Sequence, residues 1–184
     1  MIAGLVIVGL SSHSLGVLAA GGDYAADSVA IILGLAAIYI RDKNGKSMAT
    51  TYVAAINATF LLLVTGVVSG QAIHRLTSQT PEIQGLQSMI VSIFATVAMV
   101  IGALIISGDK AKEDLHMRSV LLDTISDGTS AAAVAVTGGI IYFTHHYYWL
   151  DSAVALVISV LIGFTAIKLL TDVSAAIRSN RLKS

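Results

Sequence analysis

Cysteine is absent from this sequence, proline occurs once, and charged residues make up only 12% of the chain. Without cysteine there can be no disulfide and no thiolate metal ligand. A soluble domain carries about 25% charged residues, so this chain has too little polar surface to cover a water-soluble globule. The formal net charge is zero, so no basic field points to nucleic acid. With 55% hydrophobic residues, the expected surrounding is a lipid bilayer.

Long apolar runs divide the 184 residues. A membrane-spanning helix needs about 20 apolar residues, and five segments reach that length, while Met1 to Leu10 is only half as long. The expected helices are approximately 1–10, 14–40, 50–73, 86–107, 115–143 and 150–170. We therefore predict an all-α membrane protein, a six-transmembrane-helix bundle with a shortened first helix. Residues 1–172 would be its transmembrane domain and 173–184 a short cytoplasmic tail, with no C-terminal cytoplasmic domain.

The placement of Lys and Arg predicts the orientation, because cytoplasmic loops carry an excess of both. Ten of the 11 basic residues fall on one predicted side of the membrane, and only Arg75 falls on the other. We therefore expect the loops near residues 43 and 111 and the C-terminal tail to be cytoplasmic. An even number of helices places the N-terminus there too. The protein would then be a multi-pass protein of the plasma (inner) membrane.

Four aspartates lie inside the apolar runs: Asp23, Asp27, Asp123 and Asp127. Each costs roughly 2.5 to 3.5 kcal/mol at the centre of a membrane helix, which argues that they have a use. Residues four apart lie on one helix face, so each of the two helices presents a pair of carboxylates in one direction. Because the two helices run antiparallel in this topology, Asp23 should lie at the depth of Asp127, and Asp27 at the depth of Asp123.

Four buried carboxylates cannot all be ionised without a cation, because desolvation and mutual repulsion favour their protonated forms. A divalent metal reverses this preference. Metal entry should then displace protons, and returning protons should help to eject the metal, which is the coupling that an antiporter needs. The alternative is that the aspartates are helix caps or interhelical hydrogen-bond partners, but no Lys or Arg lies at matching depth to neutralise them.

Other polar residues favour structural roles. We expect Asn57, inside the predicted third helix, to make an interhelical hydrogen bond. Ser126, Ser130 and Thr124 flank the acids and can support metal ligands, although ordinary backbone bonding is the simpler expectation. His13 and the His145–His146 pair should lie outside, near a membrane surface.

Several short motifs now resemble the transmembrane domain of the cation diffusion facilitator family. They are Asp23-Tyr-Ala-Ala-Asp27 after a serine-led loop, Asp123-Thr-Ile-Ser-Asp127, Gln71 to Leu76 followed by Pro81, and Trp149-Leu-Asp151. Their order and spacing within a six-helix layout cover nearly the whole chain. The resemblance implies export of Zn²⁺ or a similar ion from the cytoplasm in exchange for protons, usually by a homodimer. It also implies that Asp23, Asp27, Asp123 and Asp127 are the metal ligands.

The sequence departs from the family pattern in three ways. A cytoplasmic metal-binding domain usually follows the sixth helix of family members, and none is expected here. The segment Arg41 to Ser47 has no His, so we predict that an accessory metal site is absent there. The first helix is short. A His at the position of Asp23 is associated with zinc preference in the family, and all-oxygen ligation also suits Mn²⁺ or Fe²⁺. On family frequency we rank Zn²⁺ first, and Fe²⁺, Mn²⁺, Co²⁺ and Cd²⁺ after it.

Three classes of function remain open. The first is a divalent metal cation efflux transporter, Zn²⁺/H⁺ antiport being the expected reaction. The second is a non-transporting membrane subunit that pairs with and modulates a full-length metal transporter. The third is a carrier of protons or organic cations that uses the same acids. No nucleophile–base pair indicates an enzyme, and no cofactor is expected apart from the transported ion. The expected partners are the bilayer, a divalent metal ion, protons and a second copy of the chain, without nucleic acid.

Overall fold

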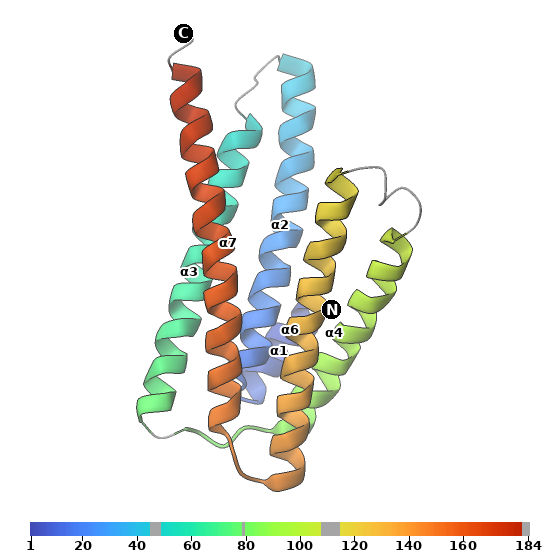
Figure 1. Ribbon diagram of the computed structural model, residues 1–184, viewed down its shortest axis with the longest axis vertical. Helices are drawn as coiled ribbons and strands as arrows, with labels where there is room; N and C mark the ends of the chain where they lie inside the picture. Colours follow the sequence, from blue (N-terminus) through green and yellow to red (C-terminus); the bar gives the residue numbers. More distant parts are fainter. Residues whose placement is uncertain (45–48, 79, 108–114, 182–184) are drawn as a thin grey trace.

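A computed structural model describes residues 1–44, 49–78, 80–107 and 115–181. These residues form six helices and no strand. The helices are α1 (Ile2–Ser11), α2 (Leu15–Asn44), α3 (Ala49–Thr77), α4 (Gly85–Ile106), α6 (Leu115–Thr144) and α7 (Trp149–Arg181). They run roughly side by side as an elongated bundle (Figure 1). The predicted all-α six-helix membrane bundle is therefore confirmed.

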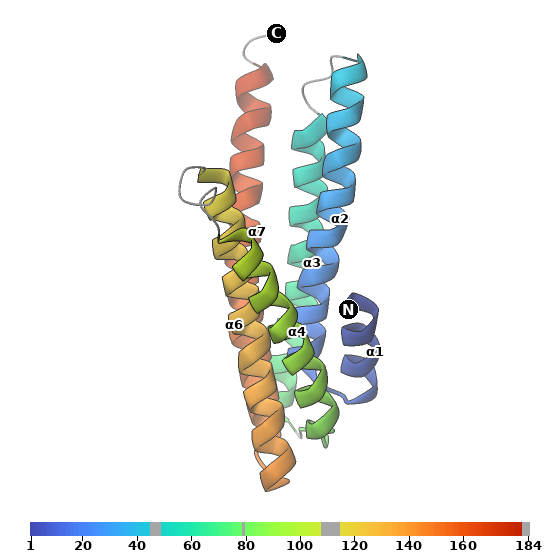
Figure 2. The same cartoon turned by 90° about the vertical axis from the view of Figure 1, so that its right-hand side faces the viewer.

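Two helix pairs, α4 with α6 and α3 with α7, make the most extensive contacts in the bundle. α2 lies between the pairs and touches α3, α6 and α7. The short α1 packs on one half of α2, which places Met1 at mid-height (Figures 1 and 2). At about 1.5 Å per residue, its 10 residues cover only one third of the length of the 30-residue α2. The first helix is therefore short, as the sequence predicts.

Four of the described helices, α2, α3, α4 and α7, are long and apolar enough to cross a membrane. α6 has 30 residues and runs alongside them. Large apolar side chains point outward along the bundle, as Phe94, Ile105, Phe143 and Phe164 do, each more than two-thirds exposed. In water such a surface would be an aggregation hazard, whereas acyl chains solvate it. This arrangement is that of an integral membrane protein.

Several hydrogen bonds hold the end of the bundle that contains residues 12–14, 78, 80–84 and 145–148, hereafter the His13 end. His13 adopts a positive φ of 57° between α1 and α2, a backbone conformation that non-glycine residues rarely adopt. The guanidinium of Arg75, at the end of α3, donates to the His13 carbonyl at 2.6 Å. The side chain of Ser88 on α4 donates to Ser12 Oγ at 3.2 Å. Four helices are thus linked at one turn.

Two glycines bring α4 and α6 together near this end. A Cβ on Gly85 would lie 2.6 Å from the Tyr142 nitrogen, and one on Gly138 would lie 2.7 Å from the Met89 nitrogen. Both distances are to backbone atoms, which cannot swing aside. Small residues at helix crossings of this kind allow close backbone approach within a membrane. The two glycines therefore set the spacing of this helix pair.

Three helices extend further than the apolar runs suggest. α2 continues to Asn44, α3 to Thr77 and α7 to Arg181, so most of the segment expected as a tail, 173–184, continues the last helix. Ala, Ile, Arg and Ser after Asp172 favour or tolerate helix, and no Gly or Pro interrupts them. Helix length here follows backbone propensity, whereas the expected boundary followed hydropathy. The segment Arg41 to Ser47, where we predict that an accessory metal site is absent, extends beyond the described residues. The basic residues Lys46, Lys110, Lys112 and Lys183 lie outside them.

Candidate metal site

The first acidic pair lies on α2. Asp23 and Asp27 are four residues apart in an uninterrupted helix that runs from Leu15 to Asn44, so both carboxylates emerge from one face. The surrounding Ala and Gly residues are small, and Ala26 is completely buried between them. This composition lets neighbouring helices approach the acids closely. Both aspartates are half-buried.

The second pair comes from α6. Asp123 and Asp127 also lie four residues apart within one helix, Leu115–Thr144. Carboxylate oxygens of Asp23, Asp27 and Asp127 all lie within 4.8 Å of one another. Within the described part of the chain, this is the one group of three or more His, Cys, Asp or Glu residues that can hold a metal ion. Residues 100 positions apart in the sequence thus meet at one point.

The two helices are joined directly at this point. Carboxylate oxygens of Asp23 and Asp127 lie within 4.8 Å of each other, as the antiparallel depth matching predicts. The Tyr24 hydroxyl, next to Asp23, donates to the backbone carbonyl of Asp127 at 3.1 Å. The Tyr24 side chain on α2 therefore helps to fix the position of Asp127 on α6.

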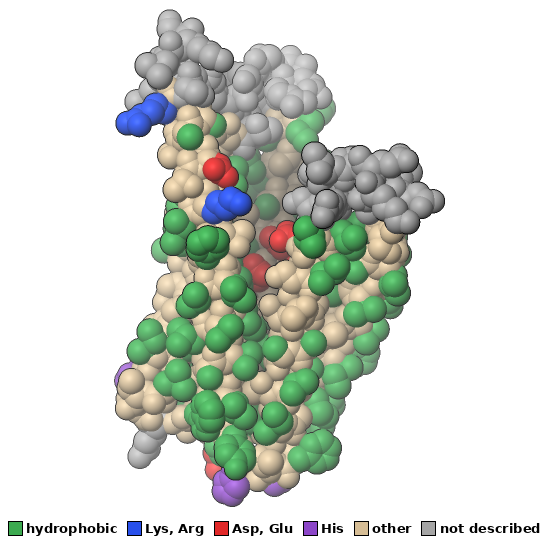
Figure 3. Space-filling model, viewed as in Figure 1, with side chains coloured by type: hydrophobic (Ala, Val, Ile, Leu, Met, Phe, Trp, Pro, Cys, Tyr) green, Lys and Arg blue, Asp and Glu red, His purple; other side chains and the backbone are tan. Residues whose placement is uncertain are grey.

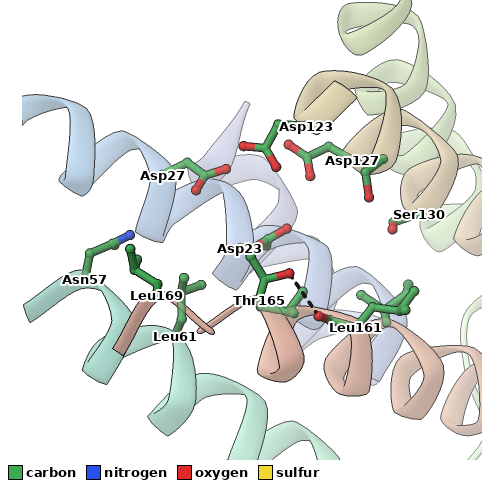
Figure 4. Close-up of a pocket in the computed structure, with 13 residues that line it drawn as sticks. Asp23, Asp27, Asn57, Leu61, Asp123, Asp127, Ser130, Leu161, Thr165 and Leu169 are labelled. Atoms are coloured by element: carbon green, nitrogen blue, oxygen red, sulfur yellow. Dashed lines mark hydrogen bonds between the residues drawn. The ribbon is translucent and has the colours of Figure 1, made fainter. Parts of the chain in front are cut away.

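Asp123 differs from the other three acids. Its side chain is exposed and it is not part of the group within 4.8 Å. It nevertheless lines the same cavity, and Figure 4 shows its carboxylate directed toward Asp27 and Asp127. The structure thus places three of the four predicted residues at one point and the fourth at the edge.

A cavity of about 210 Å³ contains the acids. It lies among α2, α3, α6 and α7, and its lining residues are Asp23, Asp27, Asn57, Leu61, Asp123, Ser126, Asp127, Ser130, Ile158, Leu161, Ile162, Thr165 and Leu169. No Lys or Arg is among them, so no fixed cation neutralises the carboxylates. Figure 3 shows acidic atoms at the base of a hollow between the two halves of the bundle. The acids are therefore open to a mobile cation.

The polar neighbours of the acids divide into two kinds. Thr124 donates to the Val120 carbonyl at 2.9 Å, and Thr165 to the Leu161 carbonyl at 3.2 Å; the ordinary backbone bonding expected for Thr124 is confirmed. Asn57 is different, because its side-chain oxygen is buried with no hydrogen-bond partner. The interhelical hydrogen bond expected for Asn57 is therefore not made by its oxygen.

One buried acid stands apart from this cavity. Asp151, in the first turn of α7, accepts hydrogen bonds from the hydroxyl of Ser14 and from the backbone N–H groups of Leu15 and Gly16. Its role is to bind the N-terminus of α2. Sequence reasoning quoted Asp151 as part of a motif without assigning it a role. Its position at the start of an apolar helix was the available signal.

Chemically, the site is an all-oxygen cluster in an apolar bundle. Three convergent carboxylates and a reachable fourth match the needs of a divalent cation, which oxygen ligands bind. His13, His145 and His146 are all exposed and lie at the His13 end of the bundle, as expected. They do not contribute to the acidic group.

Comparison with known proteins gives one family over almost the whole chain. The family description "Cation efflux transmembrane domain" matches residues 1–177. This range includes all six described helices except the last residues of α7.

Individual relatives are similar over most of this chain. The "Zinc transporter ZitB" of Yersinia pestis is 28% identical over 90% of this chain and 55% of its own length. The "Cadmium, cobalt and zinc/H(+)-K(+) antiporter" of Bacillus velezensis is 25% identical, over 88% and 55%. The human "Proton-coupled zinc antiporter SLC30A2" is 26% identical, over 92% and 50%. The chain spans about half the length of the curated relatives it matches.

Proposed function

Because this chain belongs to the cation efflux family, we propose that it carries a divalent metal ion across the membrane in exchange for protons, with Asp23, Asp27, Asp123 and Asp127 as the metal ligands. One observation supports this most: oxygens of three aspartates from two helices lie within 4.8 Å of one another inside the bundle. The relatives named above are transporters, which favours transport over catalysis.

Zn²⁺ is the first candidate for the cargo, since the names of all three relatives include zinc. Cadmium and cobalt appear in one of those names. An all-oxygen ligand set also suits Fe²⁺ and Mn²⁺. The cargo is thus a divalent cation from this group.

Proton exchange follows from the close approach of the carboxylates. Oxygens of Asp23, Asp27 and Asp127 lie within 4.8 Å of one another, carboxyl groups this close favour protonation, and a metal ion bound by them displaces protons. Metal affinity should therefore rise with pH, and a proton gradient should drive the ion in the opposite direction. Binding of Zn²⁺ to the purified protein in weak buffer should release protons, and the release should be absent in Asp127→Ala.

The bias of Lys and Arg supports an orientation with both chain ends in the cytoplasm. In the described residues, Lys168 and Arg178 lie on the half of α7 that leads to the C-terminus, while Arg75 lies at the His13 end. Export from the cytoplasm then moves the ion from the cavity toward the His13 end. We include a homodimer in the proposal, in line with the family resemblance.

The test uses purified protein in liposomes that contain a zinc-sensitive dye. Zn²⁺ entry should accelerate when a pH gradient is imposed, and Asp127→Ala should abolish the entry. Asp172→Ala is a matched control, because Asp172 is an exposed acid on α7 outside the cavity. Normal transport by Asp127→Ala would remove the site assignment. Binding without transport by the folded wild type would instead favour a subunit that works through a partner.

A further inference from the structure

The cavity contains the carboxamide side chain of Asn57 in addition to the four acids. Asn57 projects from α3, a helix that contributes none of the four aspartates. It lines the same cavity as all four of them. Figure 4 shows its carboxamide directed toward Asp27, with the nitrogen foremost. A third helix therefore reaches the acidic cluster with a polar group.

The oxygen of this carboxamide is buried and accepts no hydrogen bond. Most buried polar groups in proteins are paired, and each exception calls for an explanation. Among the residues that line the cavity, Leu61 and Leu169 are apolar, and the Thr165 hydroxyl already donates to the Leu161 carbonyl. The Asn57 oxygen thus has no hydrogen-bond partner among the described residues.

A bound cation would satisfy it. Rotation of the carboxamide by half a turn exchanges its oxygen and its NH₂ group with little change in shape. In this structure the NH₂ group faces Asp27 (Figure 4); with an ion bound, the oxygen can face the metal. We propose that Asn57 is a metal ligand that determines ion specificity, adding a neutral oxygen to the aspartate cluster. This rests on the proposed function.

The added oxygen should matter more for some ions than for others. Zn²⁺ is usually four-coordinate, so the four aspartates alone can satisfy it. Mn²⁺ prefers six oxygen ligands, so the loss of one leaves a larger deficit. Asn57 therefore raises the affinity for Mn²⁺ relative to that for Zn²⁺, and Fe²⁺ should follow Mn²⁺.

Equilibrium binding of Mn²⁺ and of Zn²⁺ to the purified protein in detergent tests this directly. Asn57→Leu has similar volume and no ligand atom, and it should weaken Mn²⁺ binding on the order of tenfold, the low end of the loss seen when groups around a metal site are removed. Its Zn²⁺ affinity should change by less than about threefold. Asn57→Asp retains an oxygen ligand and should keep Mn²⁺ binding.

Thr165→Val is the matched control, since Thr165 lines the same cavity but its hydroxyl has a backbone partner; both Kd values should stay unchanged. Circular dichroism and the thermal midpoint show whether Asn57→Leu is folded, and Asn57→Asp carries the test if it is not. Equal losses for both ions in Asn57→Leu, or unchanged Mn²⁺ binding, would overturn the proposal while leaving the aspartate site intact. A wild type that binds none of these ions would instead contradict the proposed function.

Discussion

The hydroxyl of Ser14 donates to Asp151 Oδ1 at 2.5 Å, although 137 residues separate the two in the sequence. Both side chains are buried, with Asp151 only 2% exposed. Ser14 also accepts the N–H of Val17 at 3.2 Å, and Asp151 accepts the N–H groups of Leu15 and Gly16 at 2.7 and 3.3 Å. The free N–H groups of the first turn of α2 thus have partners, one of which belongs to α7.

Asp151→Ala should destabilise the bundle, because it leaves two buried N–H groups without acceptors. Each unsatisfied group costs about 1–3 kcal/mol, so we expect a clear fall in the thermal unfolding midpoint of the detergent-solubilised protein. Asp172→Ala, on the exposed face of α7, should leave that midpoint unchanged. An equal midpoint for both variants would show that Asp151 does not support the fold.

Gly138→Ala should also be destabilising, by about 1–3 kcal/mol, as overpacking is. The new Cβ would lie 2.7 Å from the Met89 nitrogen and 3.0 Å from the Gly85 oxygen, so α4 and α6 would have to separate. Gly66→Ala is the control, because nothing lies within 4 Å of a Cβ there. Its helix should gain up to about 1 kcal/mol. Unfolding midpoints of the two variants in parallel measure both effects, and a stable Gly138→Ala would contradict the close contact.

The four aspartates should not be equivalent. Asp127→Asn removes a carboxylate from the group within 4.8 Å, whereas Asp123→Asn changes an exposed side chain at its edge. We expect Zn²⁺ affinity to fall by at least about tenfold in Asp127→Asn and by less in Asp123→Asn. Titration calorimetry on the purified variants ranks them. A larger loss in Asp123→Asn would place the ion nearer to Asp123 than to the group of Asp23, Asp27 and Asp127.

Asp23→His should keep transport and shift the preference toward Zn²⁺. An imidazole nitrogen suits Zn²⁺, while Mn²⁺ favours oxygen. Uptake of Zn²⁺, Mn²⁺ and Fe²⁺ by the same liposomes gives the ranking before and after the change. An unchanged ranking would count against direct contact between Asp23 and the ion.

Much of this arrangement follows from the sequence alone. Hydropathy predicts six helices, and the four-residue spacing of the acids predicts two paired faces. The antiparallel topology then places Asp23 beside Asp127, and their carboxylate oxygens do lie within 4.8 Å of each other. These features depend on helix periodicity and on the cost of buried charge, and a single sequence carries both.

What the sequence could not give depends on side-chain packing between distant segments. From the sequence, Asn57 is expected to be an ordinary interhelical hydrogen-bond partner. The structure shows that its side-chain oxygen has no hydrogen-bond partner. Asp123 is exposed while Asp127 is half-buried, and spacing within one helix does not specify this difference. The binding of Asp151 to the start of α2 joins residues more than 130 positions apart, and no local pattern reports it.

The acidic cluster is divided between α2 and α6, and this division has a mechanical consequence. One residue of an α-helix turns through about 100°, so a modest rotation of α6 about its own axis would withdraw Asp127 while Asp23 and Asp27 stay together on α2. The number of carboxylates around an ion would then depend on helix orientation alone, with every backbone hydrogen bond intact. Ion affinity in this protein would thereby report the relative rotation of two helices.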